Sequence, residues 1–264
     1  MYIVDCMRKV LFLLFFISIS LSAQEPKLVS SIKLDADTFV GFDSYLSLYS
    51  IKNMVLHKRG NDGAYIFNDY QLGDISSVDI INPLKIVVFY EDTNTVVFLD
   101  NKLNEIERIK FNELSEFVNI GSATNAGANK LWIFNVDSQQ LELFDYRNHR
   151  KTTVSQPFPG KLISQASNFN YCYTLTENKI RAFNVYGSLL FEKKSDDYLK
   201  MIEYDKMMAV LQENQIILLT ENSVKPIKLP ISENTVKDLQ LTRDFLYIYD
   251  GNKLHTFSFK QPKQ

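Results

Sequence analysis

The sequence contains very little cysteine. Of two cysteines in 264 residues, Cys6 precedes an apolar N-terminal stretch and Cys172 lies far along the chain. A single cysteine beyond that stretch cannot form an internal disulfide, so a disulfide-stabilised scaffold is excluded. Cys172 stands between Tyr171 and Tyr173 in an apparent strand, where a buried and unreactive thiol is expected.

Motifs of the common catalytic and cofactor sites are also missing. The sequence has no His-Glu-x-x-His, no Walker-type phosphate loop, no Gly-x-Ser-x-Gly and no Cys-x-x-Cys. His57, His149 and His255 fall in different repeats and cannot readily converge on one metal ion. We therefore expect neither a cofactor nor a histidine metal site.

Basic charge is not in excess, and glycine and proline are scarce. The formal net charge is −2, so nucleic acid is not expected as a partner. Nine glycines and seven prolines stand against 19 phenylalanines and 14 tyrosines. That balance is typical of a β-rich chain and not of a disordered one.

The apolar stretch at the N-terminus, residues 10–21, is short. Arg8 and Lys9 precede it and Ser22-Ala23-Gln24 follow it, an arrangement typical of a secretory signal peptide. A bilayer span needs about 20 apolar residues. We predict that residues 1–23 are a signal peptide and that residues 24–264 form one domain. A buried helix or an uncleaved anchor is the alternative interpretation, and Met7 could be the true start.

The predicted location follows from this segment. A lipoprotein needs a cysteine just after the apolar stretch, and Cys6 lies before it, so an N-terminal lipid anchor is not expected. After cleavage no transmembrane segment would remain. We expect an exported bacterial protein that is periplasmic or associated with the outer membrane, and an extracellular location fits nearly as well.

What the chain does contain is a repeated strand–turn–strand pattern. Residues 85–90 and 95–99 flank a polar turn, and residues 131–135 and 141–144 repeat the arrangement. Short apolar runs without helical spacing predict strands throughout. They fall into groups of four whose first strands are expected at residues 39–42, 78–81, 117–120, 162–165, 199–202 and 236–239.

Several local features belong to this pattern. The second strand of the first group is expected at residues 45–49, and one helical turn could form within residues 112–117. Residues 122–129 are small and polar, which predicts a flexible insertion. Trp132 lies among apolar strand residues and is predicted to be in the core.

The last group has three strands only, and residues 28–34 precede the first group without another role. An N-terminal strand that completes the C-terminal sheet would close a ring and remove its unpaired edges. The sequence thus predicts an all-β fold, a six-bladed β-propeller of four-stranded antiparallel blades. Five or seven blades stay open as alternatives, because the first group has the weakest register.

The repeat resembles six-bladed β-propellers of the NHL and YncE-like kind. In those proteins the hairpin of the second and third strands ends in an apolar-Phe-Asp turn, which Phe98-Leu99-Asp100, Phe144-Asp145 and Phe183-Asn184 match. The fifth copy departs from it with Leu219-Thr220. The resemblance covers the chain after its N-terminal segment and implies the fold. Enzymes, ligand sensors and assembly scaffolds share that fold, so no function follows from it.

First strands line the central channel of a propeller, and their alternate residues point inward. Aligning the six first strands places Gly41, Asp79, Asn119, Ser164, Lys200 and Lys237 at one level. We expect the last five to line the channel as a ligand-binding ring. Two lysines beside one aspartate would repel a divalent cation, so a small anion or a solvated pore is expected there. A shift of one residue would exchange the faces.

Two functions remain. The first is a non-catalytic binding or scaffold propeller of the bacterial cell envelope that mediates protein–protein interaction, within an outer-membrane complex. The alternative is a hydrolase or lyase acting on a sugar, lactone or peptide at the channel mouth. It would need converging carboxylates, for which the candidates are Asp43, Asp79, Glu203 and Asp238. Acidic hairpin tips at Glu91, Asp92, Glu177 and Glu213 would make one face acidic and suit a basic partner.

Overall fold

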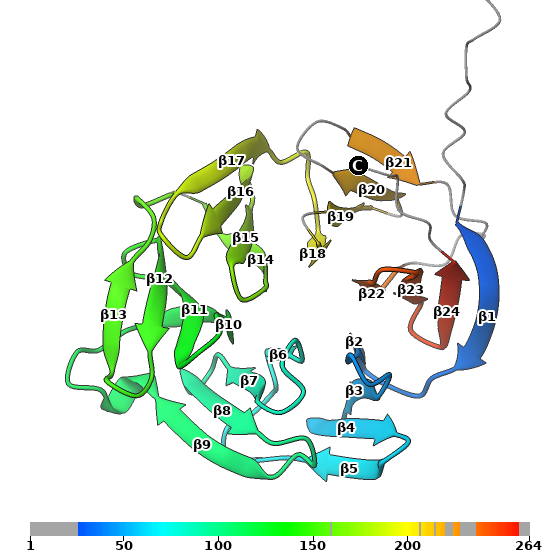
Figure 1. The fold of residues 1–264 in the computed structure, drawn as a ribbon, viewed down its shortest axis with the longest axis horizontal. Helices are drawn as coiled ribbons and strands as arrows, with labels where there is room; N and C mark the ends of the chain where they lie inside the picture. The colour runs from blue at the N-terminus through cyan, green and yellow to red at the C-terminus, as the bar shows by residue number, and fades with distance from the viewer. Residues whose placement is uncertain are drawn as a thin grey trace, which may run out of the picture.

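The computed structural model describes residues 26–158, 160–205, 207–213, 215–219, 224–227 and 236–258. The predicted signal peptide, residues 1–23, lies outside the described residues. Within the described ones, six four-stranded antiparallel sheets surround a central opening like the blades of a propeller (Figure 1). The predicted all-β, six-bladed fold is confirmed, and the alternatives of five or seven blades are wrong.

The strands occupy the following residues. Blade 1 contains β2 (Thr38–Phe42), β3 (Leu48–Lys52), β4 (Val55–Gly60) and β5 (Gly63–Phe67); blade 2 contains β6 (Ser77–Asp79), β7 (Ile86–Tyr90), β8 (Thr95–Leu99) and β9 (Glu105–Lys110). Blade 3 contains β10 (Ile120–Asn125), β11 (Lys130–Asn135), β12 (Gln140–Asp145) and β13 (Arg150–Thr153); blade 4 contains β14 (Leu162–Ser167), β15 (Tyr171–Thr176), β16 (Lys179–Asn184) and β17 (Leu189–Lys194). Blade 5 contains β18 (Lys200–Tyr204), β19 (Met207–Gln212), β20 (Gln215–Leu219) and β21 (Val224–Ile227); blade 6 contains β22 (Asp238–Leu241), β23 (Phe245–Tyr249), β24 (Lys253–Ser258) and β1 (Lys27–Lys33).

The N-terminal strand closes the ring as predicted. β1 pairs antiparallel with β24, from Lys27 opposite Ser258 to Lys33 opposite Lys253. The Tyr249 hydroxyl donates a hydrogen bond to the carbonyl oxygen of Ala36 (2.6 Å) and also lies 3.2 Å from the carbonyl oxygen of Leu34, just after β1. Blade 6 is therefore built from both ends of the described chain.

The hydrophobic core lies between blades. The strand β7 alternates, so Val87 and Phe89 pack toward blade 3 while Ile86, Val88 and Tyr90 pack toward blade 1. Every residue of β7 and β8 is consequently buried. A sheet that buries both faces reads as a continuous apolar run, which explains why the second and third strands are the clearest part of the repeat.

Several local predictions are confirmed. Trp132 is fully buried in the core. Cys172 is also fully buried, and burial raises the pKa of its thiol. A single helical turn forms at η1 (Phe111–Glu113), slightly before the expected position. No helix in the described part of the chain is long and apolar enough to cross a membrane.

Two strand predictions are wrong. The first strand of blade 3 was expected at residues 117–120, but β10 spans Ile120–Asn125 and takes half of the predicted flexible insertion. Its polar residues are ordered by pairing with β11, where Ala123 lies opposite Ile133. The second strand of blade 1 starts at Leu48 and not at residue 45, because Tyr45 and Leu46 form the preceding turn. Tertiary pairing overrides local composition in both cases.

The closing strand provides a first prediction. A chain that lacks residues 1–33, and with them β1, should lose cooperative unfolding or unfold at a temperature lower by more than about 10 °C, since the edge of β24 becomes unpaired. Thermal unfolding followed by circular dichroism measures this. The matched control lacks residues 1–25 and keeps β1. Equal unfolding temperatures for the two truncated chains would contradict a structural role for β1.

The buried Glu142 on β12 provides a second prediction. Burial raises the pKa of Glu142, more than Lys151 and Asn135 lower it. A carboxyl group whose native pKa lies above its unfolded value gains native stability as pH falls through that native pKa. Glu142→Gln should therefore raise the free energy of unfolding at pH 7, and the gain should shrink toward pH 4.5. Urea unfolding at both pH values tests this, with the exposed turn residue Glu91→Gln as control. A glutamine variant that is less stable than the parent at pH 7 contradicts it.

Candidate functional site

The antiparallel blades divide the loops between two faces of the ring. Loops after the first and third strands of each blade emerge on one face, and loops after the second and fourth strands emerge on the other. The chain entering β1 at Lys27 belongs to the first face, since Lys27 lies opposite the end of β24. The two faces differ strongly in composition.

The face formed by loops after second and fourth strands is acidic, and we call it the acidic face. Its described loops carry the acidic residues Asp35, Asp37, Asp69, Asp74, Glu91, Asp92, Glu113, Glu116, Asp137, Glu177, Asp196, Asp197, Glu213 and Asp250, against the basic residues Lys161 and Lys237. The four acidic tips predicted from sequence all lie here. Such a surface repels anions and a second copy of itself.

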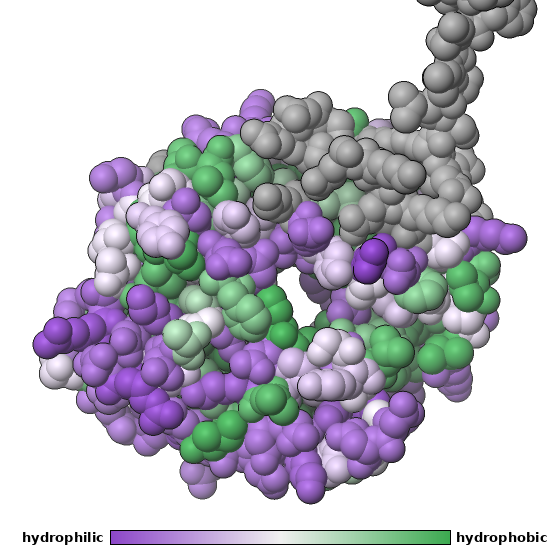
Figure 2. Space-filling view, viewed as in Figure 1, coloured by the Kyte–Doolittle hydropathy of each residue, from purple (hydrophilic) through white to green (hydrophobic). Residues whose placement is uncertain are grey.

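The opposite face exposes large apolar side chains, and we call it the apolar face. They are Tyr45 (67% exposed), Leu46 (72%), Leu84 (61%), Phe169 (42%) and Tyr186 (90%), from loops of blades 1, 2 and 4. Figure 2 shows apolar residues close to the central opening, over the region of β2, β6 and β14. The acidic face also exposes Tyr70 (66%), Phe117 (58%), Val136 (42%) and Leu199 (59%), so what distinguishes the apolar face is that its exposed apolar residues do not stand among charges of a single sign.

The charge of the apolar face is balanced. Its described loops carry the acidic residues Asp43, Asp62, Asp100, Asp205 and Asp244 and the basic residues Lys85, Lys102, Arg147 and Arg243. Lys85 is already engaged, because its ammonium donates to the Tyr146 hydroxyl at 2.6 Å. Both signs are thus interspersed around the exposed apolar residues.

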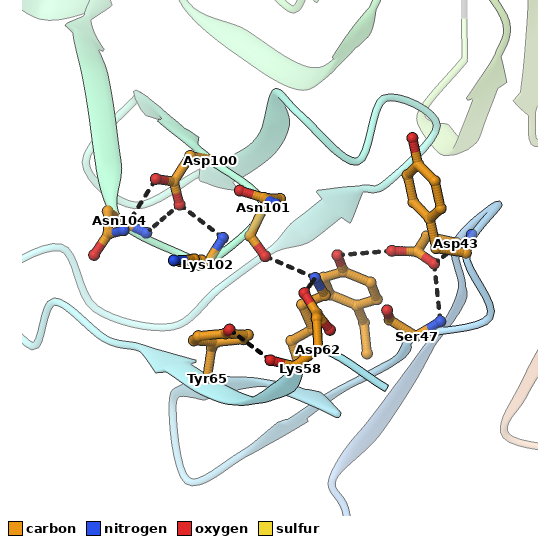
Figure 3. Close-up of polar contacts among 11 residues, drawn as sticks. Asp43, Ser47, Lys58, Asp62, Tyr65, Asp100, Asn101, Lys102 and Asn104 are labelled. Carbon is orange, nitrogen blue, oxygen red and sulfur yellow. Dashed lines mark hydrogen bonds and ion pairs between the residues drawn. The ribbon is translucent and has the colours of Figure 1, made fainter. Parts of the chain in front are cut away.

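The turn that presents Tyr45 and Leu46 is built by one buried carboxylate, Asp43 (Figure 3). Its oxygens accept hydrogen bonds from the backbone N–H groups of Tyr45 (2.9 Å) and Ser47 (2.9 Å) and from the Tyr49 hydroxyl (3.1 Å). Burial first, and the Asp43 charge second, raise the pKa of Tyr49. Leu46 at the tip has φ 63°, a left-handed conformation that is uncommon for leucine. The turn is therefore held rigidly with its apolar side chains outward.

Beside this turn, Lys58 of β4 links blade 1 to blade 2 (Figure 3). Its side chain is 3% exposed, and its ammonium donates to the Asn101 carbonyl oxygen at 2.7 Å and to Asp62 Oδ2 at 3.0 Å. The ring centroids of Tyr49 and Tyr65 lie 6.0 and 5.5 Å from the ammonium. A buried lysine with these partners is a structural cation that fixes the neighbouring turns.

Three of the predicted channel residues lie in inner strands and bond the next blade. Asp79 Oδ2 accepts the N–H of Asn125 at 2.6 Å, and burial raises the pKa of Asp79 although amide hydrogen bonds lower it. The Ser164 hydroxyl donates to the Met201 carbonyl oxygen at 3.1 Å. Lys200 forms an ion pair with Asp238 of the next blade.

These residues do not share one level of the channel. The level of an inner-strand residue can be judged from its partner on the second strand of the same blade. The partner of Asp79 is Val87, which lies three residues before the end of β7. The partner of Ser164 is Leu175, which lies one residue before the end of β15. Two residues of strand correspond to about 6–7 Å. Gly41 shares the level of Asp79, and Lys200 shares that of Ser164. The single ring expected from the alignment is therefore split.

The other two predicted residues lie outside the inner strands. Asn119 precedes β10, and its amide nitrogen approaches Asp137 Oδ1 at 3.3 Å on the acidic face. Lys237 precedes β22 and is exposed. With Lys200 and Asp250 it lines a cavity of about 380 Å³ whose apolar wall is Leu199, Leu211 and Val236. The Asp250 carboxylate there is bonded to His255 at 2.9 Å.

Gly41 lies at the contact between blades 6 and 1 with φ 148°, a conformation that a residue with a Cβ atom rarely adopts. The Gln240 side chain accepts the Phe42 N–H at 2.8 Å and donates to the Phe42 carbonyl oxygen at 2.7 Å. A Cβ atom at position 41 would approach Gln240 to 2.9 Å. Inner-strand side chains thus form the joints between blades, a role that the sequence alignment did not identify.

The four candidate catalytic carboxylates are distributed over separate blades. Asp43 builds the turn described above, Asp79 bonds Asn125, and Asp238 accepts the Phe39 N–H at 2.9 Å. Glu203 accepts a hydrogen bond from the Asn168 amide at 3.1 Å. Among the described residues, no group of three or more His, Cys, Asp or Glu is arranged to hold a metal ion.

A comparison with known protein families found no match, and none of the curated proteins is significantly similar in sequence. Solved structures share the fold at low identity. Virginiamycin B lyase from Staphylococcus aureus aligns with a TM-score of 0.60 and 11% identity, over 87% of this chain and 99% of that chain. BBS1N, solved in complex with ARL6DN, aligns with a TM-score of 0.60 and 14% identity, over 85% of this chain and 79% of that chain.

A third similar structure is PorZ of Porphyromonas gingivalis, described as an essential bacterial surface component of the type-IX secretion system. It aligns with a TM-score of 0.50 and 16% identity, over 84% of this chain and 31% of that chain. At such identities the likeness shows the propeller fold alone. Propellers of this fold include a lyase and members of protein complexes.

The Lys58 contacts provide a third prediction. Lys58→Met keeps the volume but leaves the Asn101 carbonyl oxygen without its donor, so the free energy of unfolding should fall by about 1–3 kcal/mol. Urea unfolding measures the change. Lys102→Met, an exposed lysine of the adjoining turn, is the matched control and should stay within about 0.5 kcal/mol of the parent. Equal effects of the two substitutions would show that burial of Lys58 is energetically unimportant.

Proposed function

We propose that this chain is a non-catalytic binding propeller of the bacterial cell envelope that docks another protein through its apolar face. The observation that carries the proposal is that the exposed apolar residues of one face stand among balanced charges, whereas those of the opposite face stand among charges of a single sign; on the first face they are Tyr45, Leu46, Leu84, Phe169 and Tyr186. Aromatic and large aliphatic side chains dominate the energetics of protein interfaces when they are buried in the complex.

The charge distribution supports docking by the apolar face and not by its opposite. Interface centres are depleted of charge, and the apolar face carries balanced, interspersed charges around its apolar residues. The acidic face carries a single sign of charge, which suits solubility and long-range steering of a basic partner. The channel residues support a structural role, because Asp79, Ser164 and Lys200 bond adjoining blades.

The envelope location rests on the N-terminal segment. The basic residues Arg8 and Lys9 before a short apolar stretch support export with cleavage after residue 23, so the mature domain would comprise residues 24–264. PorZ, a bacterial surface component with the same fold, is compatible with this location. Periplasmic and outer-membrane-associated positions both fit.

Site-specific photocrosslinking in native envelopes tests the proposal. A tyrosine-like photoreactive amino acid is placed at Tyr186 of the apolar face, and at Tyr70 of the acidic face as control, because both tyrosines are exposed. We expect one discrete crosslinked protein from position 186 and none from position 70. Crosslinks from position 70 alone, or from neither position, would contradict docking by the apolar face.

A further inference from the structure

The outer edge of blade 6, where β1 pairs with β24 (Figure 1), carries a chain of hydrogen bonds through a serine, a histidine and an aspartate. The strand pairing places Ser31 directly opposite His255. The Ser31 hydroxyl lies 2.8 Å from His255 Nδ1, and His255 Nε2 lies 2.9 Å from Asp250 Oδ2. We infer that Ser31 is a reactive nucleophile that accepts an acyl group from an ester carrying a negative charge. This goes beyond the proposed docking function and does not depend on it.

The hydrogen-bond chain assigns a role to each of the three groups. A carboxylate can only accept hydrogen bonds, so His255 Nε2 donates its N–H to Asp250. The lone pair of the neutral imidazole is then on Nδ1, where it accepts the hydroxyl hydrogen of Ser31. The two ring nitrogens exchange the places that they occupy in the usual catalytic triad. The roles of nucleophile, base and orienting carboxylate are the same, and such sites are recognised by these roles.

The orienting carboxylate is held by the turn between β23 and β24. Asp250 Oδ1 accepts the backbone N–H groups of Asn252 (2.8 Å) and Lys253 (2.6 Å). The turns at Asp100 and Asp145 use one oxygen in the same way, but their other oxygen accepts an asparagine amide of the same turn. In Asp250 that second oxygen is directed to the histidine of the adjoining strand.

Burial differs along the chain of hydrogen bonds. The side chains of His255 and Asp250 are 11% and 7% exposed, so the base and its orienting group are shielded from water. Ser31, at the other end, is exposed on the outermost strand of the blade. A hydroxyl that is open to solvent and bonded to a shielded base can be reached by a substrate.

Two lysines beside the serine indicate the charge of the substrate. Lys33 lies opposite Lys253, one pair along from Ser31 and His255 on the same side of the sheet. Like charges placed directly opposite each other on a sheet are unfavourable, and both lysines are exposed. An anionic group of a bound ester would relieve this repulsion while its carbonyl carbon lies near the serine.

On the other side of the serine the surface is apolar. The register shift after Leu28 leaves Val29 without a partner, so Leu28, opposite Phe257, is the next residue before Ser31 on the same side. Leu28 is 45% exposed and can contact an apolar acyl group. Bulges of this kind are common at sheet edges and beside active sites.

The reaction is a transfer of the acyl group from the ester oxygen to the serine oxygen. Ser31 Oγ forms a bond to the carbonyl carbon while its proton passes to His255 Nδ1. The bond between that carbon and the ester oxygen breaks, and the leaving oxygen takes the proton from Nδ1. The products are acylated Ser31 and the free alcohol, with no oxidant or reductant.

The experiment uses two chromogenic esters on the purified mature chain, residues 24–264. One is 4-nitrophenyl acetate, which is neutral, and the other is 3-carboxy-4-nitrophenyl acetate, which carries a carboxylate. We expect a burst of about one equivalent of nitrophenolate and an acetyl group located on Ser31 by peptide mass spectrometry. Raising the salt concentration to about 1 M should slow the reaction of the anionic ester only, because salt screens the lysines.

Variants separate the roles of the groups. Ser31→Ala and His255→Gln should slow the burst at least about tenfold. Ser30→Ala is the matched control, since Ser30 is an exposed serine of the same strand opposite Thr256, and it should react like the parent. The double variant Lys33→Gln with Lys253→Gln should slow the reaction of the anionic ester and leave that of the neutral ester unchanged.

Asp250 is a positioning residue, and Asp250→Asn tests it. Asparagine keeps an oxygen for the N–H groups of the turn, but its amide donates to His255 Nε2 and leaves the hydrogen on Nδ1. The burst should slow at least about tenfold while the unfolding temperature stays within about 3 °C of the parent. A merely structural aspartate would change the unfolding temperature and not the burst.

The inference is overturned if Ser31→Ala reacts at the parent rate, or if acetyl groups are found only on other residues. It is also overturned if His255→Gln or Asp250→Asn reacts as the folded parent does. A reaction of the anionic ester that neither salt nor the lysine variant slows overturns the assigned charge of the substrate. Crosslinking from position 186 is measured independently, so failure of the reactive serine leaves the docking proposal untouched.

Discussion

The structure depends on one constraint: the middle strands of the blades bury both faces against the neighbouring blades, completely so in β7 and β8. Phe98 of β8 packs toward blade 3, while Val97 and Leu99 pack toward blade 1. No blade can therefore bury its apolar surface alone, and stability is gained only when neighbours are in place. The ring geometry follows, since a linear array would leave an apolar sheet face exposed at each end.

The same constraint decides what the inner strands can do. Because neighbouring blades must be held at a fixed distance, polar side chains of the inner strands form hydrogen bonds to the adjacent blade. Gln240 brackets the backbone of Phe42, and the Gln165 amide donates to the Thr124 hydroxyl at 2.8 Å. Polar residues of the channel wall are thus largely committed to neighbouring blades. Loops also contribute such contacts, as Asn101 does with Lys58, but their exposed residues are free to differ between the two faces.

This division explains which parts of the molecule the sequence could predict. The middle strands carry apolar residues on both faces, so they can be recognised in the sequence as continuous apolar runs. The closing strand β1 could be predicted because the last group of strands lacked a fourth member. The inner strand β10 reads Ile-Gly-Ser-Ala-Thr-Asn, and its polar composition hid it within an expected insertion. How far each inner strand is shifted along the channel depends on its pairing with the second strand, and local composition does not encode that pairing. The sequence alignment therefore placed Asp79 and Ser164 at the same height in the channel, which the structure does not. The apolar face was missed because turn residues such as Tyr45 and Leu46 were assigned to a strand.

The closing strand has a consequence for the order of events during biosynthesis. β1 is the first of the described strands to be made, and its partner β24 is the last. Until Lys253–Ser258 has been synthesised, blade 6 lacks the strand with which β1 pairs, and the other five blades cannot be closed into a ring. The nascent chain must keep β1 unpaired for the whole of that time, a strand that contains Leu28, Val29 and Ile32. The ring can therefore close only after the last described strand has been made, and until then the unpaired N-terminal strand is open to misassociation.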